Sequence, residues 1–248
     1  MKHLLTLILA LVISFNANAN ANTDLTNFNN SYDELLKQYV KNDSVKENTK
    51  LALVDYKKLK SDKILLKTSN LIKKVKVSTL SKNDQLAFWI NAYNFYTIEL
   101  IANNYPVKSI KDLGSFFNSV WDKHKFEVEG KQYSLNNIEH SIIRPVFKEP
   151  RTHFALVCAS ISCPDLLNEA YKGEILDKQL DMQTKKFLNN DTKGVIVKSG
   201  MVKVSKLFRW YKQDFYDKNP LVFIQDYKNI NYIHGYLPYN WNLNSLND

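Results

Sequence analysis

Both cysteines of this chain lie in one short run of sequence, close to a histidine and an arginine. Cys158 and Cys163 follow shortly after Arg151 and His153. A thiolate is a good nucleophile and an imidazole can transfer protons, so hydrolases and acyl-transfer enzymes use this combination. The apolar residues 154–157 predict a strand that runs into a turn carrying both thiols. We therefore take Cys158, Cys163 and His153 as candidate catalytic residues and Arg151 as a candidate binding residue.

The sequence leaves three states open for the two thiols: a local disulfide, two inert buried thiols, or one nucleophile. An oxidising compartment would favour the disulfide, whereas the four intervening residues differ from the redox Cys-x-x-Cys spacing and argue against an oxidoreductase. In a regular strand His153 and Cys158 point to opposite faces. We therefore expect either that Cys163 turns back toward His153, or that Cys158 pairs with His140 or His234.

A second candidate group lies on the helix predicted over residues 135–144. Glu139 falls within the apolar face of this helix, and His140 lies at its edge on the side of Arg144. A buried carboxylate is costly unless it is paired. We expect Glu139 to be buried against Arg144 or Arg151, or to line a pocket as an acid or base. His140 is a further catalytic candidate, although an edge histidine is more often a satisfied core residue.

The strongest predicted helix spans residues 82–104 and is apolar on almost every side, which is typical of a buried central helix. Asn91 and Asn94 share one face of it, and buried amides need hydrogen-bond partners. We take both as candidate binding residues together with Arg144 and Arg151. Papain-like and transglutaminase-like enzymes place their nucleophilic cysteine at the start of such a helix, and this one contains none. That absence argues against a standard cysteine protease.

The remaining pattern predicts a single α+β domain, with a helical N-terminal part around the central helix and a small antiparallel sheet; a distant relation to papain-like or transglutaminase-like folds is one alternative. Short helices are expected over 51–59 and 65–75, and longer ones over 174–189 and 205–215. The turns Glu129-Gly130-Lys131 and Ser199-Gly200 predict two hairpins.

The N-terminus has the pattern of a secretory signal, with a basic start, an apolar run over 4–13 and the small-residue site Ala17-Asn18-Ala19. We expect a signal peptide over 1–19, a helical extension over 20–48 and the domain over 49–248. This predicts a soluble protein of the periplasm or a secreted one, without a membrane span. The net charge of +9 comes from scattered lysines, so we expect no nucleic-acid partner. No motif indicates a cofactor or metal.

Three stretches, residues 88–94, 134–140 and 149–166, resemble the domain-of-unknown-function 547 family. Further matching positions place the resemblance over roughly residues 50–228. This chain has Glu149-Pro150-Arg151 where the family often has Asp-Pro-Arg, which keeps the charge. The resemblance implies a relationship but no reaction, substrate, cofactor or catalytic residue.

Two functions remain in competition. The first is a periplasmic hydrolase or acyl-transfer enzyme with a Cys/His/Glu pocket. The second is a non-catalytic domain that binds a ligand or an envelope component, in which a polar network only fixes the core. The partner in either case would be a small molecule, a peptide or an envelope component.

Overall fold

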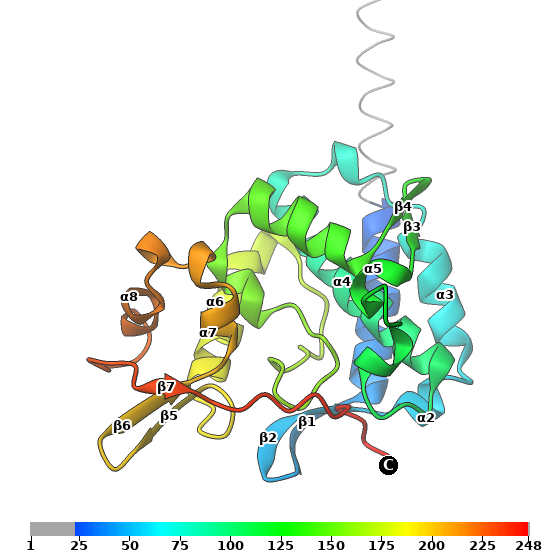
Figure 1. Ribbon diagram of the computed structural model, residues 1–248. Helices are drawn as coiled ribbons and strands as arrows, with labels where there is room; N and C mark the ends of the chain where they lie inside the picture. Colours follow the sequence, from blue (N-terminus) through cyan, green and yellow to red (C-terminus); the bar gives the residue numbers. More distant parts are fainter. Residues whose placement is uncertain (1–22, 248) are drawn as a thin grey trace, which may run out of the picture.

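Helix α4 (Lys82–Asn104) forms the centre of the fold because most of its side chains between Leu86 and Ala102 are apolar and buried. The Ser81 side chain caps it by accepting a hydrogen bond from the backbone N–H of Asp84. The computed structural model describes residues 23–247, and Figure 1 shows the other elements arranged around α4. The signal peptide predicted over residues 1–19 lies outside the described residues.

The N-terminal part packs directly on α4. A helix over 23–39 places Phe28 and Tyr32 against Phe88 and Phe95 of α4. The elements that follow are β1 (Val40–Lys46), β2 (Thr49–Val54), α2 (Tyr56–Leu59), α3 (Lys63–Ile72) and the 3-10 helix η1 (Val77–Thr79).

Two predictions for this part are wrong. The extension predicted as helical over 20–48 becomes strand β1 after residue 39, and the short helix predicted over 51–59 begins only at Tyr56, after β2. Strand β2 is buried on both faces: Leu51 and Leu53 pack on Ile161, whereas Ala52 and Val54 face the main core. A strand that is buried on both faces reads as a continuous apolar run, which periodicity does not separate from a helix.

In the middle of the chain, the helix predicted over residues 135–144 is confirmed, whereas the strand predicted over residues 154–157 does not form. Its elements are η2 (Ile110–Leu113), α5 (Val120–Lys123), the hairpin β3 (Phe126–Val128) and β4 (Lys131–Tyr133), the π-helix η3 (Asn137–Phe147) and the 3-10 helix η4 (Pro150–Phe154). Residues 155–158 follow η4 without joining a sheet. The Asn94 amide bonds the carbonyl of Ala155 and the N–H of Val157, so a strand partner is not needed there.

The C-terminal part forms a smaller unit of packing. Its elements are η5 (Gly173–Ile175), α6 (Leu176–Leu188), β5 (Val195–Lys198), β6 (Met201–Val204), α7 (Leu207–Trp210), η6 (Lys212–Asp214), η7 (Tyr216–Lys218), α8 (Pro220–Gln225) and β7 (Gly235–Tyr236). The helix predicted over 205–215 is therefore interrupted after Trp210. Strands β5 and β6 are antiparallel, and β7 joins β6 in parallel.

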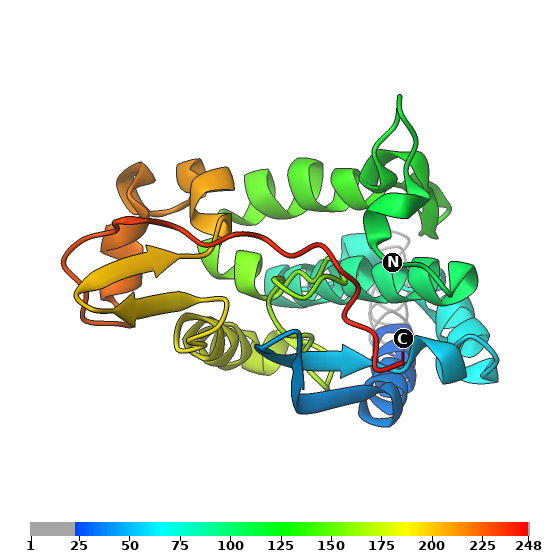
Figure 2. The same ribbon diagram turned by 60° about the horizontal axis from the view of Figure 1, so that its bottom comes forward.

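The fold is α+β, as predicted, and within residues 23–247 the strands lie in three small sheets rather than one. A large apolar cluster surrounds α4, and a smaller one gathers Phe154 with the aromatic residues of α7 and α8. The segment after β7 runs back along the molecule to β1 and β2 in both views (Figures 1 and 2). Within the described residues, no helix has the length and hydropathy needed to cross a membrane.

Candidate active site

A cavity of about 400 Å³ lies where the two apolar clusters meet. Its lining comes from helices α4, α5, η3, η4 and α7, from the thiol turn and from the C-terminal segment. The lining residues are Tyr93, Ser119, Trp121, Asn136, Glu139, His140, Arg144, His153, Leu156, Cys158, Cys163, Leu207, Trp210, Tyr211, Tyr239 and Trp241. Both thiols, two histidines, one carboxylate and one guanidinium therefore face the same space.

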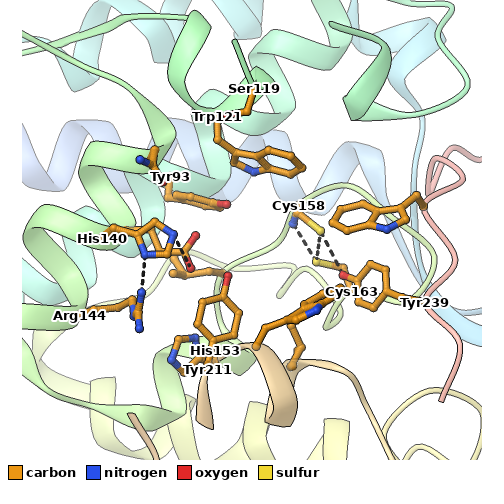
Figure 3. Close-up of a pocket in the computed structure, with 16 residues that line it drawn as sticks. Tyr93, Ser119, Trp121, His140, Arg144, His153, Cys158, Cys163, Tyr211 and Tyr239 are labelled. Carbon is orange, nitrogen blue, oxygen red and sulfur yellow. Dashed lines mark hydrogen bonds and ion pairs between the residues drawn. The ribbon is translucent and has the colours of Figure 1, made fainter. Parts of the chain in front are cut away.

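The two thiols form one wall of the cavity (Figure 3). Both are free, Cys158 half-buried and Cys163 buried, and their sulfur atoms are 2.7 Å apart. The Cys158 Sγ also lies 3.3 Å from the Ser160 Oγ and 3.3 Å from the Tyr239 hydroxyl. Burial opposes ionisation of Cys158, but hydrogen bonds from Cys163, Ser160 and Tyr239 outweigh it and lower its pKa from 9.0 to about 7. Burial and the neighbouring Cys158 raise the pKa of Cys163.

Three separate parts of the chain hold the thiol turn in place. Asn94 binds the residues just before Cys158. On the other side, the buried Lys193 donates to the Cys163 carbonyl at 2.6 Å and to Asp165 at 2.7 Å. The C-terminal segment pairs with Ser160 and binds the carbonyl of Ala159.

Ala159, next to Cys158, has φ of +58°, the left-handed region that a residue with a Cβ rarely adopts. The surrounding hydrogen bonds therefore hold the turn in a strained backbone conformation. Such strain persists only where neighbouring structure enforces it, and it concentrates at functional sites.

The opposite wall is formed by π-helix η3 and by Tyr211. Glu139 is 5% exposed; the Tyr211 hydroxyl hydrogen-bonds to it, and the His140 Nε2 lies 3.8 Å from its Oε1. Arg144 bonds the Nδ1 of His140. Because a guanidinium can only donate, Nδ1 is the acceptor and the neutral His140 ring carries its proton on Nε2, toward Glu139. Burial and the charge of Glu139 raise the pKa of Tyr211, so Tyr211 stays a hydroxyl donor.

Asp214 joins this wall to the histidine of η4. It accepts hydrogen bonds from the His153 Nε2 at 2.8 Å and from the Arg144 Nη2 at 3.0 Å. Burial acts against its ionisation, but the bonds from His153 and Arg144 prevail and hold the Asp214 pKa well below its usual 3.8. The His153 ring stacks on Tyr211 with centroids 4.1 Å apart. The orientation of Tyr211, and through it that of Glu139, therefore depends on the Asp214 cluster.

The structure gathers most of the sequence-predicted site residues and separates the rest. Cys158, Cys163, His153, His140, Glu139 and Arg144 line the cavity. Asn91 and Asn94 lie in the core instead, where they bind the backbone of Tyr171 and of residues 155–157. Arg151 pairs with Glu149 and Asp177, away from the cavity.

The expected pairing of Glu139 with an arginine is wrong, although its burial is confirmed. Among the described residues, the ion pairs of Arg144 and Arg151 are with other carboxylates. The prediction placed Glu139 correctly on the apolar face of its helix. The partner was missed because Asp214 lies 70 residues after Arg144 and competes for the same guanidinium. His234, the other suggested partner of Cys158, accepts a hydrogen bond from the Val202 N–H instead.

Sequence reasoning missed the aromatic part of the cavity. These residues are Tyr93, Trp121, Trp210, Tyr211, Tyr239 and Trp241. Trp210, Tyr239 and Trp241 pack on one another, and Trp121 packs on Trp241. The only available signal was the concentration of aromatic residues near the end of the chain, which does not show what they face. Across residues 23–247, no group of three or more His, Cys, Asp or Glu side chains is placed to hold a metal ion.

Comparison with known proteins identifies a family for the centre of the chain. Residues 77–188 match the model of the family described as "Protein of unknown function, DUF547". No curated protein and no solved structure matches the chain. The matched segment contains α4, η3 and both thiols, whereas Tyr211, Asp214 and Tyr239 lie beyond it. The match over residues 77–188 therefore supports the resemblance to this family that the sequence motifs indicate.

Proposed function

We propose that the cavity is the active site of a thiol-dependent hydrolase or acyl transferase in which Cys158 is the nucleophile. One observation carries the proposal: the Cys158 sulfur lines a cavity and accepts hydrogen bonds from neighbours that bring its pKa to about 7. A large share of Cys158 is then thiolate at neutral pH, and the thiolate is the reactive form. The nucleophile therefore needs no separate base to activate it.

The first half of the reaction follows from this position. The Cys158 thiolate attacks the carbonyl carbon of an ester or thioester, and a carbon–sulfur bond forms. The leaving group departs with the electron pair of the broken bond and takes a proton from water in the cavity. The Tyr239 hydroxyl, 3.3 Å from the sulfur, is close enough to donate to the oxygen that becomes negative during the attack.

Glu139 is suited to the second half. It faces the cavity as an acceptor, held by Tyr211 and near the His140 Nε2. It takes the proton of a water molecule, or of an acceptor hydroxyl, as that oxygen attacks the thioester. The carbon–sulfur bond breaks, Cys158 leaves as a thiolate, and the proton on Glu139 returns to solvent. His140 and Tyr211 position the carboxylate in this scheme.

The test is to trap the acyl-enzyme. Activated esters and thioesters of varied acyl groups are incubated with the protein, and intact mass and peptide mapping locate the adduct. We expect acylation of Cys158 and none in Cys158→Ala. Glu139→Gln should accumulate the adduct because its removal slows, whereas Glu127→Gln, on strand β3 outside the cavity, should behave as wild type. Unchanged ester turnover in Cys158→Ala would contradict the proposal.

The aromatic lining favours a second candidate, a binding domain without catalysis. Trp210 is 45% exposed beside Tyr239 and Trp241, and such surfaces bind planar or apolar faces of ligands. In this case the ligand would be a small molecule, a peptide or an envelope component. Ligand-induced quenching of tryptophan fluorescence, together with no acylation of Cys158 by any ester tested, would favour binding over catalysis.

We also propose that the protein acts outside the cytoplasm. The support is the basic start, the apolar run 4–13 and the small-residue site at 17–19. Expression in a Gram-negative host, followed by fractionation and intact-mass measurement, should give periplasmic protein beginning at Asn20 or Asn22. Protein that retains Met1 would contradict export.

A further inference from the structure

The acyl-transfer scheme uses Cys163 only as a hydrogen-bond partner, yet its position is that of a second reacting thiol. We infer that Cys158 and Cys163 form a reversible dithiol–disulfide couple that exchanges with a dialkyl disulfide entering the cavity. The inference goes beyond the proposed function, because it concerns a redox reaction and depends on both sulfurs. The spacing in the sequence, which differs from the redox Cys-x-x-Cys motif, argues against such a reaction, but the turn brings the two sulfurs together.

The distance between the sulfurs is the first support. They lie 2.7 Å apart, and a disulfide bond is about 2.05 Å long, so they need to approach by only about 0.7 Å. The backbone already brings them together: the Cys158 N–H donates to the Cys163 Sγ at 2.9 Å, and the Cys163 N–H binds the Ser160 carbonyl. Closing the bond therefore needs little movement of the turn.

The second support is the difference in access. Cys158 is half-buried at the cavity wall, whereas Cys163 is only 3% exposed. An incoming disulfide can reach Cys158 first, and Cys163 can then attack only the mixed disulfide formed on Cys158. Burial and the adjacent Cys158 raise the pKa of Cys163, which keeps Cys163 protonated until that second step. This division into an attacking and a resolving thiol is what thiol–disulfide exchange requires.

The exchange balances in two steps. The Cys158 thiolate attacks one sulfur of R–S–S–R, a new sulfur–sulfur bond forms, and one R–S⁻ leaves with the electron pair of the broken bond. That R–S⁻ takes the proton of Cys163, whose thiolate then attacks the Cys158 sulfur and expels the second R–S⁻, which is protonated by water. The protein dithiol is oxidised by two electrons and the dialkyl disulfide is reduced to two thiols.

The experiment equilibrates the native full chain with glutathione and glutathione disulfide in graded ratios. Samples are quenched with acid, alkylated and weighed intact. We expect wild type to pass to a form that has lost two hydrogens, without a lasting glutathione adduct. Cys163→Ser should instead retain one glutathione on Cys158, and Cys158→Ser should stay unmodified while folded. Cys163→Ala repeats the test if the serine variant does not fold.

Two results would overturn the inference. One is a stable glutathione adduct on Cys158 of the wild-type protein; the other is a disulfide that appears only after denaturation. Neither bears on the acyl-enzyme, which is tested in reduced protein, forms on Cys158 and uses Cys163 only as a hydrogen-bond partner. Acylation of Cys158 in Cys163→Ser would thus support the proposed function even where the redox couple fails. Conversely, a disulfide that forms in the folded wild-type protein, together with no acylation of Cys158, would support the redox couple and contradict the proposed function.

Discussion

Polar side chains are buried in two regions of this protein, and the two regions use them differently. On α4, Asn91 and Asn94 are 0% and 2% exposed, and each binds both a backbone carbonyl and a backbone N–H of a distant segment. At the cavity, Glu139 and Cys158 bind side chains instead, and both border open space. The first arrangement fixes the chain, whereas the second leaves capacity for a ligand.

The difference shows why burial of a polar residue does not by itself indicate a site. An amide that binds a backbone carbonyl and a backbone N–H uses both its donor and its acceptor group to hold the chain. A carboxylate or thiolate that borders a cavity still has lone pairs that can act on a substrate. Substitutions on α4 should therefore alter mainly stability, and substitutions at the cavity should alter mainly reactivity.

The largest effect on stability is expected for Asn94→Ala. The change leaves the Ala155 carbonyl and the Val157 N–H without partners in the core, and each unsatisfied group costs roughly 1–3 kcal/mol. We expect the free energy of unfolding to fall by about 4 kcal/mol, measured by urea denaturation. Asn104→Ala, near the end of the same helix, is the matched control and should change it by less than about 0.5 kcal/mol. An equal loss of unfolding free energy in both variants would show that the buried bonds of Asn94 do not stabilise the fold more than an exposed asparagine does.

Asp214→Asn tests the boundary between the two regions, because Asp214 supports the cavity wall through His153 and Arg144. Replacing a charged acceptor should lower the free energy of unfolding by about 2 kcal/mol near neutral pH. The folded-state pKa of Asp214 is depressed, so its contribution is present above the ordinary pKa and is lost as pH falls.

The difference between wild type and Asp214→Asn should therefore shrink between about pH 5 and pH 2. Denaturation at graded pH measures it, with Asp226→Asn as the control carboxylate. A difference that stays constant with pH would show that the ionised form of Asp214 is not what stabilises the fold.

Local signals in the sequence predict much of the fold. The all-round apolar pattern of 82–104 and the turn Glu129-Gly130-Lys131 depend on neighbouring residues only, and α4 and the β3–β4 hairpin form as predicted. The strand predicted near residue 156 fails because Asn94, more than 60 residues earlier, takes the backbone groups that a strand would pair. The residue pattern around position 156 gives no indication that Asn94 binds these backbone groups.

The candidate site likewise contains residues that the sequence indicates and residues that it does not. Glu139, Cys158 and their neighbours could be found because polar residues at apolar positions are visible in the sequence. Tyr239 and Trp241 could not, because they reach the cavity only when the C-terminal segment returns and pairs with the thiol turn. Pairing between segments so far apart in the chain produces no local residue pattern, so the sequence alone does not predict it.

Glu139→Gln should separate reactivity from stability. Among residues 23–247 no arginine forms an ion pair with Glu139, and glutamine keeps an oxygen that can accept from Tyr211. We therefore expect a loss of only about 1 kcal/mol in the free energy of unfolding, with accumulation of acylated Cys158 in the same protein. A loss of about 3–5 kcal/mol, the usual cost of breaking a buried ion pair, would place Glu139 with the α4 asparagines as a structural residue.

The smallest effect on stability, and the most specific test of the cavity, is expected for Tyr239→Phe. The change removes one hydroxyl that hydrogen-bonds to Cys158 and Ser160 but keeps the ring that packs on Trp210 and Trp241. The free energy of unfolding should change by less than about 1 kcal/mol.

The Cys158 thiolate, in contrast, loses one of the donors that lower its pKa in this variant, so the Cys158 pKa should rise from about 7 toward 9.0. The rate of iodoacetamide labelling measured against pH reports this directly, and its midpoint should move to higher pH. Tyr236→Phe, on strand β7 just before the C-terminal segment, should leave the midpoint unchanged. An unshifted midpoint in Tyr239→Phe would mean that the thiolate does not depend on the aromatic wall.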